Sequence, residues 1–213
     1  MQITHLGHAC VLVESAGTRV LLDPGNFTDD WHGVERLDAI IATHQHPDHF
    51  DPEHVPALVA ANPAAVVLLE AELAERAGVE ATPLHPGDEV GVGGLTVRAV
   101  GGRHAIIHPD IPGVGNVGVL LSAPGEPTFF HPGDALDQTP EGVDVVAVPA
   151  HGPWAAMKEH IDFIRALGAG HGFMVHDGLL SERGLGLAWN RYREMTSTEF
   201  DDLRDHQPRE YRA

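Results

Sequence analysis

The sequence predicts an α/β domain in which two β-sheets pack face to face and helices cover their outer sides, an αββα four-layer sandwich. The 213-residue chain divides into two strand-rich halves, each with flanking helices. Most of its strands are joined by short glycine turns, whereas a doubly wound parallel sheet needs a helical crossover between strands. The length suffices for one sizeable core. We therefore expect residues 1–213 to form a single domain, with a polar C-terminal tail from about residue 190.

Hydrophobic patterning predicts the elements of the first half. Two apolar segments at 9–15 and 19–25 flank the small turn at 16–18, which indicates a hairpin. Residues 38–43 are continuously apolar and β-branched, as in a buried strand. A helix that stops at a proline, a buried strand and a short helix closed by a glycine are expected at 52–63, 64–70 and 71–78.

The second half is dominated by strands. We expect a hairpin and four strands, at residues 88–102, 116–122, 128–134, 143–150 and 170–178. An amphipathic helix at 154–168 ends at Gly168, and the polar remainder is expected to begin as a helix. Residues 113–118 match G-x-G-x-x-G literally, but a proline precedes them and a strand follows, which predicts a turn and not a dinucleotide site.

Charge and cysteine content exclude several classes of partner and of metal site. With 31 acidic and 13 basic residues the net charge is -18, which argues against nucleic acid or anionic membranes as partners. The single cysteine, Cys10, excludes a cysteine-rich zinc site and is expected to be a small buried hydrophobic residue. The N-terminal sequence has no signal-peptide pattern and no stretch reaches ~20 apolar residues, so a cytoplasmic protein is expected.

The stretch THQHPDH at 43–49 follows a predicted strand directly. His44 and His46 are two residues apart, so in an extended segment both rings can face one metal ion. Pro47 turns the chain, and Asp48 and His49 can then reach a neighbouring position. Histidine and carboxylate ligands suit zinc, and also iron or manganese. The alternatives are an exposed loop of solvated histidines, or a helix start that Asp48 caps.

The pattern His-x-His-x-Asp-His is similar to the signature of the metallo-β-lactamase superfamily. Further segments resemble that family in the expected order over about residues 1–187, namely 3–25, 99–108, 129–136 and 172–178. The opening ITHLGHA and the compact length resemble the branch that contains L-ascorbate-6-phosphate lactonase and N-acyl-phosphatidylethanolamine phospholipase D. The resemblance implies the metallo-β-lactamase fold.

The resemblance also implies a set of ligands for two metal ions. One ion would be held by His44, His46 and His104, and the other by Asp48, His49 and His176. Asp134 would lie between the ions, and Asp48 or Asp134 would shuttle the catalytic proton. Asp23 would accept a hydrogen bond from a ligating histidine without binding metal itself. His108 is the rival of His104 as third ligand.

The activity implied is that of a binuclear metal-dependent hydrolase. A metal-bound hydroxide would cleave an ester, lactone or phosphodiester in a small-molecule substrate. Zinc is the expected cofactor, because His46 stands where the flavodiiron branch typically carries a glutamate. Mn²⁺ and Fe²⁺ are the alternatives. Two other functions stay open: a non-catalytic metal-binding or regulatory member of the fold, and an iron-dependent oxidase or dioxygenase. The protein could also form a homo-oligomer.

Four further residues are candidates for the surroundings of the site. His8, His151 and Trp154 are expected near a substrate pocket, although local packing is an alternative for each. His131 stands in HPGD, where many members of the family have a threonine, and we favour its interpretation as a surface residue over the alternative that it approaches the site.

Overall fold

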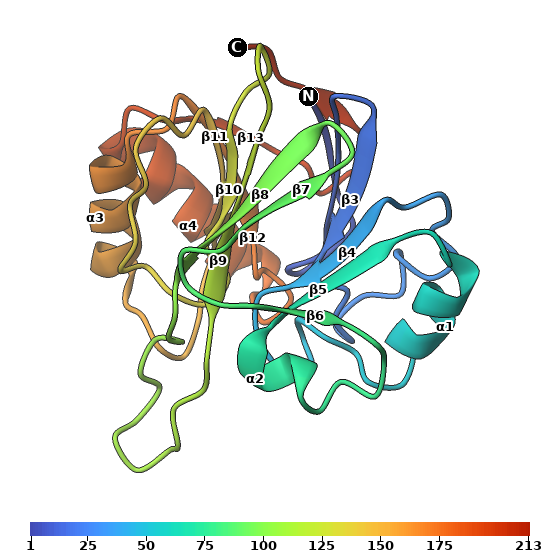
Figure 1. The fold of residues 1–213 in the computed structure, drawn as a ribbon. Helices are drawn as coiled ribbons and strands as arrows, with labels where there is room; N and C mark the ends of the chain where they lie inside the picture. The colour runs from blue at the N-terminus through green and yellow to red at the C-terminus, as the bar shows by residue number, and fades with distance from the viewer.

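Two seven-stranded sheets pack face to face in the computed structural model, which describes residues 1–213 (Figure 1). Helices α1 (Val55–Ala61) and α2 (Ala71–Ala74) lie outside the first sheet. Helices α3 (Met157–Leu167) and α4 (Glu182–Met195) lie outside the second. The predicted αββα sandwich is therefore confirmed. None of these helices is both long and apolar enough to cross a membrane.

The first sheet has the order β14-β1-β2-β3-β4-β5-β6. Its strands are β1 (Gln2–His5), β2 (Val11–Ser15), β3 (Thr18–Leu22), β4 (Ala39–Ala42), β5 (Val66–Glu70), β6 (Thr82–Leu84) and β14 (Arg209–Glu210). The first three run antiparallel, and β3 to β6 run parallel. Because α1 and α2 cross over between the parallel strands, the loops after those strands meet at one end of the sheet.

The second sheet has the order β13-β12-β11-β10-β9-β8-β7. Its strands are β7 (Glu89–Val92), β8 (Leu95–Gly101), β9 (Val117–Ser122), β10 (Phe129–His131), β11 (Val145–Pro149), β12 (His171–Val175) and β13 (Glu199–Asp201). Strands β10 to β13 run parallel. Helix α3 ends at Gly168 with a left-handed φ of 68°, as its sequence predicts.

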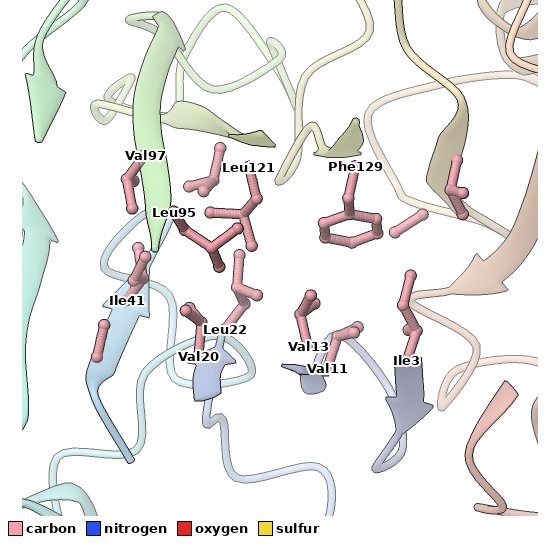
Figure 2. Close-up of a cluster of buried hydrophobic side chains, with 14 of the residues drawn as sticks. Ile3, Val11, Val13, Val20, Leu22, Ile41, Leu95, Val97, Leu121 and Phe129 are labelled. Atoms are coloured by element: carbon pink, nitrogen blue, oxygen red, sulfur yellow. The ribbon is translucent and has the colours of Figure 1, made fainter. Parts of the chain in front are cut away.

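The main core lies between the two sheets. Figure 2 shows side chains such as Val11 and Val13 of the first sheet pointing toward Leu121 and Phe129 of the second. Alternate residues of a strand face opposite sides, so the intervening Leu12 packs in a separate cluster on the outer face, with α1 and α2. A third cluster joins α3 and α4 to the second sheet. Burial on both faces fixes the register of the strands.

The segment from about residue 190, expected as a polar tail, contains regular structure. Helix α4 continues to Met195, and β13 then pairs with β12 in parallel. Further on, β14 pairs antiparallel with β1. The segment thus adds one short strand to an edge of each sheet.

Candidate metal centre

A first cluster of potential ligands forms where β4, β8 and β10 end. His44, His46, His104 and Asp134 each offer a ligand atom, and these atoms all lie within 4.8 Å of one another. The Nε2 atom of His44 is 3.0 Å from Nδ1 of His46. The Nε2 atom of His104 is 3.4 Å from Oδ2 of Asp134. The two histidines of the His-x-His pair thus converge, although residues 43–46 form bends after β4 and not the extended segment that we expected.

A second cluster lies beside the first. It consists of His8, Asp48, His49 and His176, with ligand atoms again within 4.8 Å of one another. The Nε2 atom of His176 is 3.4 Å from Oδ2 of Asp48 and 3.1 Å from Oδ2 of Asp134. The other oxygen of Asp134, Oδ1, is 3.1 Å from Nε2 of His49. Asp134 therefore lies between the two clusters.

The turn after β4 is held by Asp23, which follows β3. One carboxylate oxygen of Asp23 accepts from the Thr43 backbone N–H at 2.7 Å, and the other accepts from the Thr43 hydroxyl at 2.8 Å. That second oxygen is also 2.7 Å from Nδ1 of His49. Asp23 is fully buried. It therefore ties the start of the motif to its end.

Three histidines have their outer ring nitrogen engaged. Besides His49, His104 places Nδ1 2.6 Å from the Ala105 carbonyl, and His176 places Nδ1 2.6 Å from the His151 carbonyl. A carbonyl can only accept, so these Nδ1 atoms carry the proton. The Nε2 lone pairs then face the interior of the site, which is how protein histidines are oriented toward metals.

The unsatisfied polar atoms test whether the site fits a cation. Nε2 of His49, Nε2 of His104 and Oδ1 of Asp134 are buried without a hydrogen bond of acceptable geometry. Nε2 of His49 and Oδ1 of Asp134 lie 3.1 Å apart without forming a hydrogen bond, so proximity does not satisfy either atom. Leaving buried polar groups unpaired costs about 1–3 kcal/mol each. Convergent nitrogen and carboxylate donors without partners fit divalent metal ions of the zinc, manganese or iron type.

The charges of the side chains in the site compensate one another. Burial acts to raise the pKa of Asp134, but the neighbouring side chains of His49, His104 and His176 hold that pKa well below its usual range. Burial acts to lower the pKa of His176, but Asp134 and Asp48 raise it to about 9. A proton would therefore leave His176 when a cation binds.

The remaining sequence candidates fall in different places. Trp154 donates its indole N–H to Oδ2 of Asp134 at 2.9 Å. His151 is exposed and contributes its carbonyl to the site. His108 is exposed, lies beside Asp110 and belongs to neither cluster.

The interpretation of His131 as a surface residue is wrong. Its ring is buried because β10 lies between β9 and β11, with both faces of the sheet covered. Nε2 of His131 is 3.0 Å from the Ala9 carbonyl and 3.8 Å from Oδ2 of Asp23. His131 thus lies next to Asp23, the residue that supports the motif.

Asn116 was not predicted from the sequence. Its Oδ1 accepts from the Asp134 backbone N–H at 3.0 Å, and its Nδ2 donates to the Pro132 carbonyl at 3.0 Å. It thereby shapes the turn that presents Asp134. Asn116 directly precedes β9 in a glycine-rich turn, and nothing in that part of the sequence indicated this contact.

Two cavities adjoin the clusters. One of about 450 Å³ is lined by Trp154, Ala105, Leu136 and Phe163 among others. The second, of about 290 Å³, is formed by the loop between β8 and β9 and reaches His46 and His104. Both volumes suit small molecules.

The fold and the clusters define a class, the αββα sandwiches with metal-ligating side chains at one end of their sheets. Residues 2–171 match the family described as the Beta-lactamase superfamily domain. Protein Rv0786c of Mycobacterium tuberculosis is 42% identical over 204 residues, which cover 95% of this chain and 96% of that protein. A UPF0173 metal-dependent hydrolase of Azorhizobium caulinodans is 32% identical over 158 residues, 63% of each chain.

A solved structure agrees in fold. Igni18, described as a metallo hydrolase from the archaeon Ignicoccus hospitalis, superposes with a TM-score of 0.76 at 14% identity and covers 99% of both chains. The chain therefore belongs to the metallo-β-lactamase superfamily, as its motifs predict. The branch within the superfamily stays a prediction.

Proposed function

We propose that this metal-dependent hydrolase of the metallo-β-lactamase superfamily uses two divalent ions, with zinc as the native metal. Its substrate would be a small molecule with an ester, lactone or phosphodiester bond. The superfamily match and the relatives described as metal-dependent hydrolases support hydrolysis. A cytoplasmic location and any self-association stay predictions.

The observation that carries the proposal is the pair of clusters around Asp134. His44, His46 and His104 would hold the first ion, and Asp48, His49 and His176 the second. Asp134 presents one oxygen to His49 and the other to His104 and His176. One carboxylate reaching both clusters supports two neighbouring ions better than a single one.

The chemistry divides between the ions and the chain. When bound, two divalent ions supply a water of lowered pKa and polarise the bond that is cleaved. Asp48, whose carboxylate is partly exposed, would carry the proton from the site toward the leaving group. Trp154 would fix the rotamer of Asp134 through its indole N–H. The cavities beside His46 and Trp154 would bind the substrate.

The direct test combines metal analysis with a substrate panel. Protein purified without added metal should contain two zinc ions per chain by elemental analysis. A panel of lactones, esters and phosphodiesters should include a substrate that the wild type hydrolyses and Asp48→Ala does not. Equal rates for the two proteins on every substrate would reject metal-dependent hydrolysis at this site. Two iron ions per chain, with oxygen consumption, would instead support an oxidase.

A further inference from the structure

His8 connects the two sheets at the second cluster. It lies in the turn between β1 and β2, and its backbone carbonyl accepts from the His176 N–H at 2.7 Å. Its Nδ1 accepts from the Gly178 backbone N–H at 3.1 Å. Its Nε2 is 3.0 Å from Oδ2 of Asp48. One residue thus contacts the segment after β12 in the second sheet and the motif after β4 in the first.

The backbone determines which ring nitrogen of His8 carries the proton. The Gly178 N–H can only donate, so Nδ1 of His8 must be unprotonated. The proton of the neutral ring then sits on Nε2, which donates it to Asp48. A protonated nitrogen has no lone pair for a metal ion. His8 therefore belongs to the second cluster by position but is not one of its ligands.

The ring of His8 is also held by packing. Its side chain is 1% exposed, and its centroid lies 4.6 Å from that of Phe27 and 4.3 Å from that of His176. A Cβ at Gly178 would lie 3.0 Å from Nδ1, closer than most Cβ contacts, so the close approach favours glycine there. The φ of 48° at His8 lies in the left-handed region, which few residues other than glycine adopt. The ring therefore has one orientation.

We propose that His8 is a positioning residue selective for the second metal ion, because it fixes Asp48 from one sheet relative to His176 from the other. His8 has no hydrogen bond to His44, His46, His104 or Asp134. Its loss should therefore leave the first ion in place. The inference rests on the two-ion site proposed above.

The test is a zinc titration of metal-free protein against a chelating indicator, which resolves two affinities. His8→Phe keeps an aromatic ring of similar shape but removes both side-chain hydrogen bonds. Loss of an outer-shell partner costs about 10–100-fold in metal affinity. In His8→Phe we expect the affinity for the second ion alone to fall, so that dilute protein retains one ion per chain. His8→Gln, whose amide both accepts and donates, should restore much of the affinity.

His171→Phe is the matched control, since this half-buried histidine lies at the opposite end of β12 from His176. It should bind both ions as the wild type does, and circular dichroism should show all variants folded. Unchanged affinities in His8→Phe, an equal loss for both ions, or no recovery in His8→Gln would each overturn the role of His8. Wild-type protein that binds fewer than two ions would instead overturn the two-ion proposal, and this inference with it.

Discussion

Asp134 receives contacts from both clusters and from outside them. His49, His104 and His176 approach its two oxygens from the ligand side. Trp154 donates to Oδ2 from the side of the larger cavity. The indole thus links the position of this carboxylate to the wall against which a substrate would lie.

Replacing Trp154 with phenylalanine should lower kcat/KM at least about tenfold. A hydrogen bond to a charged group contributes about 1.5–3 kcal/mol, and 1.4 kcal/mol corresponds to a factor of ten. Metal content should stay at the wild-type value, because no ligand is removed. Trp189→Phe in α4, where Trp189 packs near Phe200, is the control and should leave kcat/KM unchanged. An equal loss in both variants would contradict a specific role for Trp154.

Removing the Asp23 carboxylate should affect folding as well as metal binding. Asp23→Ala leaves the Thr43 N–H and the His49 ring without their buried acceptor. We expect the free energy of unfolding of metal-free protein to fall by about 3 kcal/mol or more. Metal affinity should fall by about 10–100-fold.

Urea unfolding of the metal-free variant and its zinc titration measure the two effects. Asp38→Ala removes an exposed carboxylate that accepts from the Arg19 backbone, and it provides the control for loss of an acid. Equal stability of the two variants would show that Asp23 does not support the motif.

At the scale of elements, the motif turn packs directly on the segment after β3. A Cβ at Gly25 would overlap the backbone carbonyl of Asp48. This contact places the turn, and with it the ligands on either side of Pro47. Gly25 therefore acts on the site through backbone packing and not through a side chain.

Gly25→Ala should consequently weaken zinc binding and lower the unfolding midpoint, since the turn must move to admit a methyl group. Gly186→Ala in α4 introduces the same methyl group into open space and should be neutral or slightly stabilising, because alanine favours a helix. Thermal unfolding and zinc titration of both variants test this. A neutral Gly25→Ala would mean that the turn is free to shift.

The sequence predicted the layers and the contiguous part of the site because both depend on local patterns. His44, His46, Asp48 and His49 follow one strand within six residues, so their convergence can be read from spacing. The contacts of His8 and Trp154 could not be predicted, since their partners Gly178 and Asp134 come from distant segments. The orientation of a ring depends on those partners.

The error at His131 has a related cause. His131 lies in the strand expected at 128–134, but the proline and glycine that follow it are typical of a surface turn. Whether such a turn is exposed depends on the strand order, and β10 occupies the middle of its sheet. Strand order is a property of the whole fold, and hydrophobic patterning within one segment does not contain it.

At the scale of the molecule, each proposed ion would join the two sheets. The motif belongs to the first sheet, whereas His104, Asp134 and His176 follow strands of the second. Each bound ion would stabilise the native state only, by about 2.7 kcal/mol at a hundredfold excess over its dissociation constant, so that two ions would contribute roughly twice that.

Chelation, which removes both ions, should therefore lower the Tm by about 10–20 °C, given about 2–4 °C per kcal/mol for a chain of this size. Scanning fluorimetry with a chelator, and then with zinc in excess, should show the loss and its reversal. His46→Ala should respond much less, because it lacks a ligand. An identical Tm for wild-type protein with and without chelator would contradict metal bridging between the sheets.

The two terminal strands have a consequence for solubility. Strands β13 and β14 are short, and charged residues such as Asp201, Arg209 and Glu210 lie in them. They cover the open backbone of β12 in one sheet and of β1 in the other. Without them, the backbone groups at the edges formed by β12 and β1 would be available for pairing with other chains. We therefore expect the polar C-terminal segment to lower the tendency of the two sheets to pair with other chains.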